Sequence, residues 1–261
     1  MLPIALITDF GEKDWFAAVM KAVIYSINPK AKIIDVTHEI SPQNVNEAAF
    51  VLWNASRQFP SKTLFVTVVD PGVGSGRKII AVKTDNHIFL APDNGVTGMA
   101  LSGSRIIKSV HVENHKFFRH TVSRTFHGRD IFAPVAAHLS KGLALQQLGS
   151  PAPYIPEQTP FVDATRPGRY RGRILYIDRF GNLITNLKVP LRASGTAEII
   201  PHQKGLKSRK IHLVSTYSDV RRGKLLAYPG SSGLLEIAVR EGSAQQIIGA
   251  TYSIPVYLKI G

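Results

Sequence analysis

Residues 63–95 read TLFVTVVDPGVGSGRKIIAVKTDNHIFLAPDNG and contain a strand, a glycine-rich loop and a hairpin, in that order. The opening run of Leu, Phe, Val and Thr is typical of a strand buried on both faces of a sheet. This strand ends on Asp70, three glycines follow, and Arg77 closes the loop. An arginine within reach of Asp70 would keep its carboxylate ionised and fix its direction. The residues after Arg77 predict a hairpin that turns at Asp85 and Asn86.

Apolar spacing extends this pattern toward the N-terminus. Residues 3–8 and 32–37 are further apolar runs, rich in Ile, Val and Thr. Apolar residues recur at helical spacing over 15–27 and 45–53, which predicts two intervening helices. Alternating strands and helices imply right-handed crossovers and a mostly parallel sheet with helices on both faces. We therefore expect a three-layer α/β domain in the N-terminal part.

The C-terminal part has a different pattern. Its strand-like segments are separated by Gly and Ser turns, show no long helical period, and occupy 171–189, 209–217, 224–242 and 252–260. Such segments predict an antiparallel β-barrel domain. The expected fold class is therefore α/β, with an N-terminal three-layer domain and a C-terminal antiparallel β-barrel.

Charge and proline content separate these two parts. The net charge is +14, and residues 166–224 hold fourteen lysines and arginines against three acids. Prolines within 151–160 disfavour regular structure, as is typical of a linker. We expect an N-terminal domain over 1–152, a linker over 153–168 and a C-terminal domain over 169–261.

Composition excludes several classes of protein and of site. The chain has no cysteine, so it has no disulfide scaffold, thiol nucleophile or cysteine-ligated metal. It lacks an apolar run of the roughly twenty residues that span a membrane and a basic leader at its start, so we expect a cytoplasmic protein without a membrane partner. Its basic charge raises nucleic acid as a partner. However, HQKGLKSRK at 202–210 lacks aromatics for base stacking, so nucleic-acid binding is only the alternative.

Polar side chains follow three strands of the predicted sheet. Asp9, His38 and Asp70 lie at carboxyl ends, the edge where open α/β sheets bind ligands. Arg77 opens the hairpin, whose return strand brings Asp93 to the same edge. We expect one crevice surrounded by Asp9, Asp70, Arg77 and Asp93. The alternative for each aspartate alone is a turn or helix cap.

His127 precedes a predicted helix that begins near Asp130. The positive end of a helix disfavours imidazolium, which leaves a neutral ring able to accept a proton or bond to water. The alternative is a loop histidine bonded to the backbone. No H-E-x-x-H or similar ligand cluster is present, so we expect no metal site.

Seven motifs now identify a resemblance: ITDFG, DVTHEISPQNV, VVDPGVGSGR, APDNG, FHGRDIFAPVAA, DRFGN and SSGLLEIAV. In order and spacing they resemble the S-adenosyl-L-methionine (SAM) hydroxide adenosyltransferases, or SAM hydrolases, which are related to SAM-dependent fluorinases and chlorinases. The resemblance covers essentially the whole chain. It implies an α/β domain, a β-barrel domain, and a homotrimer that holds SAM between neighbouring subunits.

The resemblance also implies roles for individual residues. Asp70, Arg77 and His127 would prepare a water molecule, and Asp9 would bond to the ribose hydroxyls. In the C-terminal domain, Asp178 would meet the methionine ammonium and Ser231 its carboxylate, while the adenine would contact Phe180 and Asn182. The products would be adenosine and L-methionine.

The chemistry of SAM agrees with these roles. Attack at C5′ expels a neutral thioether, so the leaving group needs no acid, and only the attacking water must be oriented and deprotonated. No cofactor is required, because SAM is the substrate. Pairing with Arg77 lowers the basicity of Asp70, which favours His127 as proton acceptor, or shared hydrogen bonding without a single base. A halogenase is the alternative enzyme, disfavoured because the Asp70 carboxylate would repel an anion. A non-catalytic SAM-binding sensor is the third possibility.

Overall fold

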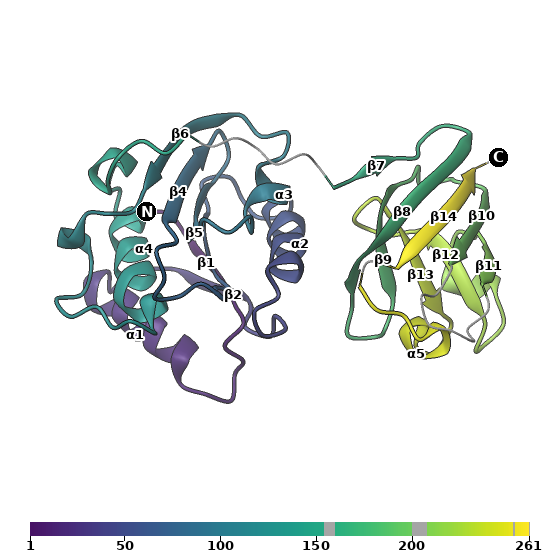
Figure 1. Ribbon diagram of the computed structural model, residues 1–261, viewed down its shortest axis with the longest axis horizontal. Coiled ribbons are helices and arrows are strands. Elements are labelled where there is room, and N and C mark those ends of the chain that lie inside the picture. The colour runs from purple at the N-terminus through teal and green to yellow at the C-terminus, as the bar shows by residue number, and fades with distance from the viewer. Residues whose placement is uncertain (154–159, 200–207, 253, 261) are drawn as a thin grey trace. The chain divides into compact units, whose positions relative to one another are not determined.

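The computed structural model describes residues 1–153, 160–199, 208–252 and 254–260, and the chain forms two compact units, Met1–Thr159 and Pro160–Gly261 (Figure 1). The domain limits expected from the sequence stay a prediction. Residues 154–159 of the predicted linker and 202–207 of the basic stretch lie outside the described residues.

A six-stranded sheet forms the centre of the N-terminal unit, in the order β2-β1-β3-β5-β4-β6. Its strands are β1 (Ile4–Thr8), β2 (Ile33–Thr37), β3 (Leu64–Val68), β4 (Ile79–Thr84), β5 (Ile88–Pro92) and β6 (Ile106–His111). The β1–β2, β1–β3 and β3–β5 pairs are parallel, whereas β4 is antiparallel to both its neighbours. This confirms the mostly parallel sheet and the hairpin over β4 and β5.

Helices cover both faces of this sheet (Figure 1). On one face, α1 (Phe16–Ile27) packs against α4 (Ala133–Ser140); on the other, α2 (Val45–Ser56) packs against α3 (Gly98–Leu101). The first face buries Leu6 and Val66 of the sheet with Met20 and Val135 of the helices. The three-layer expectation is therefore confirmed. Short 3₁₀ turns occupy His115–Phe117 and Leu145–Gln147.

The C-terminal unit is an eight-stranded, nearly closed sheet in the order β11-β10-β14-β8-β9-β13-β12, with β7 beside β9. Its strands are β7 (Val162–Asp163), β8 (Gly168–Ile177), β9 (Leu183–Lys188), β10 (Gly195–Ile199), β11 (Arg209–His212), β12 (Leu225–Pro229), β13 (Leu234–Val239) and β14 (Pro255–Ile260). All pairs except β7–β9 are antiparallel. An isolated bridge joins Leu213, directly after β11, to Ala227 of β12, and so connects the two ends of the sheet. This confirms the barrel.

Four elements of this unit were not predicted from the sequence. They are β7, which lies within the expected linker, β10, the 3₁₀ turn Tyr217–Asp219 and the short helix α5 (Ala244–Ile248). Across the described ranges, no helix combines the length and apolar character needed to cross a bilayer.

Candidate active site

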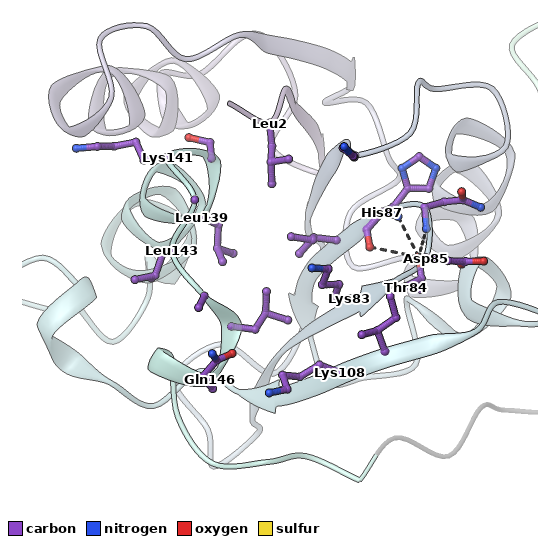
Figure 2. A pocket seen from close by; sticks show the side chains of 18 of the residues that line it. Leu2, Lys83, Thr84, Asp85, His87, Lys108, Leu139, Lys141, Leu143 and Gln146 are labelled. Atoms are coloured by element: carbon purple, nitrogen blue, oxygen red, sulfur yellow. Dashed lines mark hydrogen bonds between the residues drawn. The ribbon is translucent and has the colours of Figure 1, made fainter.

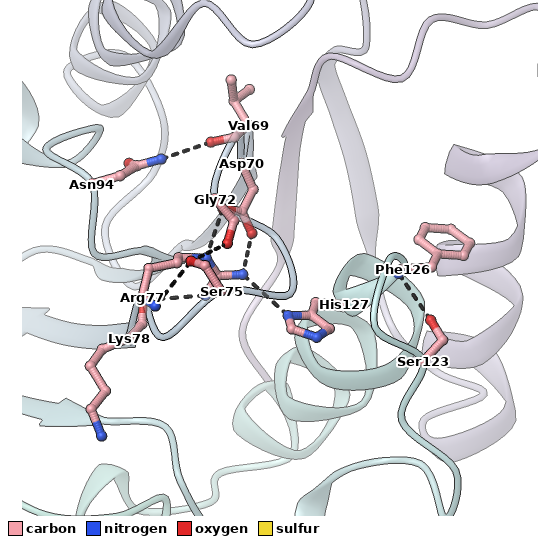
Figure 3. Close-up of polar contacts among 10 residues, drawn as sticks. All are labelled: Val69, Asp70, Gly72, Ser75, Arg77, Lys78, Asn94, Ser123, Phe126 and His127. Atoms are coloured by element: carbon pink, nitrogen blue, oxygen red, sulfur yellow. Dashed lines mark hydrogen bonds and ion pairs between the residues drawn. The ribbon is translucent and has the colours of Figure 1, made fainter.

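Asp70 and Arg77 form an ion pair across the glycine-rich loop that follows β3 (Figure 3). Arg77 Nε donates to Asp70 Oδ1 at 2.7 Å, and a second guanidinium nitrogen, Nη2, binds Oδ2. The side chains are 6% exposed for Asp70 and 12% exposed for Arg77, so water screens this pair weakly. The expected contact between the two ends of the loop is therefore present.

The glycines let this loop fold tightly against the segment that precedes His127. Gly74 has a φ of +78°, and a Cβ placed there would lie 2.5 Å from the backbone oxygen of Arg124. A Cβ on Gly76 would meet no atom within 4 Å. Close approach of two backbones thus requires a glycine at position 74 but not at position 76.

His127 lies directly before a π-helical turn, Gly128–Phe132, that leads into α4. Its Nδ1 lies 3.3 Å from Arg77 Nη2 (Figure 3). Because a guanidinium can only donate, Nδ1 is the acceptor and the ring proton of the neutral form sits on Nε2. Burial lowers the pKa of His127, and the charge of Arg77 lowers it further. This lowered pKa favours the neutral ring that the sequence predicts. Its causes are burial and Arg77, whereas the sequence argument relied on the positive end of a helix.

A hollow of about 320 Å³ lies beside this group, at the carboxyl edge of the sheet. Asp9, Asp70 and His127 line it, with Phe10, Phe16 and Phe126 among the apolar lining residues. Asp9 Oδ2 accepts a hydrogen bond from the Gln43 backbone N–H at 2.8 Å. Burial raises the pKa of Asp9, against the effect of this bond, and the charge of Asp70 raises it too.

Three residues expected at this edge do not line the hollow. Asp93 and Arg77 are absent from its lining, which corrects the expected crevice; Arg77 instead contacts the lining residues Asp70 and His127. The backbone N–H of Asp93 donates to the Lys78 carbonyl. His38 is buried and lies 2.8 Å from Thr8 Oγ1 and 3.1 Å from Asp35, so its contacts are internal. Sequence order places residues at an edge, but whether a side chain faces the ligand depends on its backbone direction.

Asp130, expected only to mark the start of a helix, fixes the segment that carries His127. Its side chain is fully buried and accepts two bonds from Arg129, at 2.7 and 2.9 Å. It also accepts the Ser123 backbone N–H at 2.9 Å. Apolar residues follow Asp130 in the sequence, so an acid at the start of an apolar run was the available signal.

In the C-terminal unit, Asp178, Phe180 and Asn182 lie together on the turn between β8 and β9. Asp178 Oδ1 accepts the backbone N–H groups of Phe180 and Asn182 at 2.9 Å, and Oδ2 accepts Asn182 Nδ2 at 2.8 Å. The Phe180 side chain is thus held at the tip of the turn, 76% exposed. Ser231 is exposed on the loop between β12 and β13.

A chain of side-chain hydrogen bonds behind Asn182 was not predicted. Asn182 Nδ2 lies 3.3 Å from the Tyr217 hydroxyl, which lies 2.6 Å from the Tyr228 hydroxyl, and Tyr228 donates to Glu236 Oε2 at 2.6 Å. Burial raises the pKa of Glu236 and that of Tyr228. Tyr228 and Glu236 are cross-strand partners, so a carboxylate within an apolar strand was the one sequence signal. No group of three or more His, Asp or Glu suited to a metal ion occurs among the residues that the structure describes.

Comparison with known proteins gives matches along nearly the whole chain. Family models for the SAM hydroxide adenosyltransferase N-terminal and C-terminal domains match residues 4–149 and 172–257. An (R)-S-adenosyl-L-methionine hydrolase of Thermus thermophilus is 35% identical over 99% of this chain and 100% of its own. A fluorinase of Actinoplanes is 27% identical over 90% of each chain. The crystal structure of an uncharacterized conserved protein from Thermotoga maritima has a TM-score of 0.87 and 38% identity, covering 98% of this chain and 99% of that one.

Proposed function

The chain belongs to the SAM hydroxide adenosyltransferase family, and on this premise we propose that it hydrolyses SAM at C5′ of the ribose to adenosine and L-methionine. The observation that carries the proposal is the Asp70–Arg77–His127 group beside a hollow at the carboxyl edge of the sheet. In the reaction the oxygen of water bonds to C5′, the C5′–sulfur bond breaks, and the sulfur keeps the electron pair as a neutral thioether. One proton is released.

Two observations favour water over halide as the nucleophile. Relatives named as SAM hydrolases are 34–36% identical to this chain, whereas the fluorinase of Actinoplanes is 27% identical. The Asp70 carboxylate, mostly shielded from solvent, would repel a desolvated halide at the attack position. The same carboxylate attracts the hydrogen atoms of water.

The contacts of Arg77 indicate which of His127 and Asp70 donates a hydrogen bond to the water and which accepts its proton. His127 Nδ1 faces the guanidinium, so Nε2 carries the ring proton. The ring also has a hydrogen bond to the Ser123 backbone, so donation from Nε2 to the water oxygen would replace that bond. Asp70 remains as the acceptor for the proton that water loses, either directly or on the way to solvent. This assignment reverses the preference for His127 that the sequence alone favoured. Arg77 then orients both partners of the water.

The subsites for the rest of SAM follow from the same family membership. Asp9, at the hollow, would bond to the ribose hydroxyls. The exposed ring of Phe180 would stack on the adenine and Asn182 would bond to it. Asp178 would meet the methionine ammonium, and Ser231 its carboxylate. The reaction needs no cofactor, because the sulfonium supplies its own leaving group.

The assembly and location of the protein stay predictions. The family resemblance supports a homotrimer with sites between subunits, which sedimentation of the purified chain would test. A cytoplasmic location rests on sequence features alone.

The test is chromatography of the full chain incubated with SAM in oxygen-18 water. Labelled adenosine and methionine are expected from the wild type and from His120→Ala, a control at an exposed histidine. Asp70→Ala and His127→Ala should lose turnover while still binding SAM. Binding without turnover in the wild type, or a 5′-halogenated product when halide is added, would refute the proposal.

A further inference from the structure

A second, larger hollow of about 790 Å³ lies at the opposite edge of the N-terminal sheet (Figure 2). Its lining includes the end of β4 and the start of β5, whereas Asp9 and Asp70 follow the ends of β1 and β3. The volume is within the roughly 300–1,000 Å³ range of small-molecule pockets. This hollow shares no lining residue with the candidate active site.

Four lysines from separate segments line this hollow: Lys62, Lys83, Lys108 and Lys141. Asp85 is the one acid among the lining residues. Within the described part of the chain, none of the four ammonium groups forms an ion pair with a carboxylate. The hollow therefore has a positive lining whose charge the protein leaves unbalanced.

Lys83 and Lys108 are direct cross-strand partners on β4 and β6. Figure 2 shows both side chains extending toward the segment that carries Leu143 and Gln146, whereas Lys141 points away. Like charges directly opposite each other on neighbouring strands destabilise a sheet. A bound anion would relieve this repulsion, since it would contact both ammonium groups at once.

The same hollow also has an apolar wall. Leu2, Ile88 and Leu143 line it, are only partly buried, and pack against the core between the sheet and α4. Leu139, also in the lining, is 1% exposed. A fully hydrated inorganic anion would leave this wall in contact with water, whereas a ligand with an apolar portion would cover it.

We propose that this hollow binds a small organic anion: an apolar body bearing a carboxylate, sulfonate or phosphate group that contacts Lys83 and Lys108. The inference does not depend on the proposed hydrolysis, because it uses none of the residues assigned to that reaction. The two can therefore fail separately.

The test uses anilinonaphthalene sulfonate, an aromatic sulfonate, as a fluorescent probe of the full chain with saturating adenosine present. Binding is expected to persist in adenosine, which occupies the candidate active site. Lys108→Glu places an opposite charge across from Lys83, so the Kd should rise at least tenfold while the melting temperature rises. The double variant Lys83→Gln/Lys108→Gln removes both charges with little change in shape and should weaken binding similarly.

Lys116→Ala is the matched control, because Lys116 is an exposed lysine that does not line the hollow. It should leave the Kd unchanged, and all variants should keep SAM turnover. Probe binding that adenosine abolishes, that Lys108→Glu and the double variant leave intact, or that Lys116→Ala weakens equally would overturn the proposal. Competition by millimolar phosphate as strong as that by benzoate would show that the apolar wall plays no part.

Discussion

Arg77 binds both oxygens of the Asp70 carboxylate through two nitrogens of one guanidinium group. This planar, two-point contact fixes the direction of the carboxylate as well as its charge. The same Nη2 also lies beside His127, so one arginine sets the position of two groups around the expected water.

Replacing Arg77 with lysine tests this geometry. Lys keeps the positive charge but cannot make the two-point contact or reach His127 in the same way. We expect Arg77→Lys to lower kcat about 100-fold, the scale of loss that a misplacement of about 1 Å can cause, with a smaller change in the Kd for SAM. Discontinuous assays of adenosine formation measure kcat, and titration calorimetry measures the Kd for SAM. An unchanged kcat would mean that the charge alone suffices.

The protonation of His127 predicts an acid limb in the pH–rate profile. Burial and Arg77 lower the pKa of His127 below its ordinary value of 6.5, and the neutral ring is the form that accepts from Arg77. Turnover should therefore fall as the pH drops through this lowered pKa. Removing the positive charge in Arg77→Gln should raise the pKa of His127 and move the acid limb to higher pH, as NMR titration of the ring would report.

The same shift has a consequence for stability. Unfolded His127 titrates near 6.5, above its value in the folded protein, so the unfolded state binds more protons in that interval. Stability contributed by the neutral ring is thus present above about pH 6.5 and is lost as the pH falls. Urea denaturation of wild type and His127→Gln across this range should show a smaller pH dependence in the variant.

Gly74 and Gly76 provide a matched pair within one loop. Gly74→Ala puts a Cβ against the Arg124 carbonyl at a positive φ, whereas Gly76→Ala places it in open space. We expect Gly74→Ala to destabilise the protein by about 2 kcal/mol or more and to reduce kcat, because the left-handed backbone alone costs roughly 1–2 kcal/mol. Gly76→Ala should stay within about 0.5 kcal/mol of wild type. Equal effects from the two would contradict the close backbone contact.

The fully buried carboxylate of Asp130 should contribute more to stability than an exposed carboxylate does. Asp130→Asn replaces one acceptor oxygen by a donor where Arg129 and the Ser123 backbone N–H donate, and a mismatched buried polar group costs about 1–3 kcal/mol. The control is Glu241→Gln, which breaks the exposed pair with Arg222 and should leave the free energy of unfolding almost unchanged, because water screens exposed ion pairs. Similar midpoints for the two variants in urea would show that Asp130 is not structurally important.

The sequence predicted five of the six strands of the sheet and the helices α1, α2 and α4, because apolar periodicity reports burial directly. It did not predict β6 or the four-residue helix α3. It predicted that Asp9 and Asp70 share a hollow because the carboxyl ends of parallel strands meet at one edge. Asp93 followed the same rule and does not line the hollow, since the rule places a residue without fixing where its side chain points. The contact from Tyr228 to Glu236 depends on cross-strand register, which no local pattern specifies.

Asn182 has a free acceptor but no free donor. Its two amide hydrogens are directed at Asp178 Oδ2 and the Tyr217 hydroxyl, and within the described residues no donor contacts Oδ1. The chain through Tyr228 to Glu236 holds the Tyr217 hydroxyl in place. An amide fixed in this way suits a 6-amino purine, which donates, and not a 6-oxo purine, which accepts.

Removing the Tyr217 hydroxyl should therefore relax base selectivity. In Tyr217→Phe one amide hydrogen of Asn182 loses its partner, so the amide can turn and offer that hydrogen to a 6-oxo group. The ratio of kcat/KM for SAM to that for its inosine analogue should fall about 3- to 10-fold, the value of one hydrogen bond. Tyr25→Phe, at an exposed tyrosine on α1, should leave the ratio unchanged. If Tyr217→Phe instead lowered kcat/KM for both substrates by the same factor, the hydroxyl would serve only to stabilise the fold, because a structural defect has no reason to distinguish an amino from an oxo group.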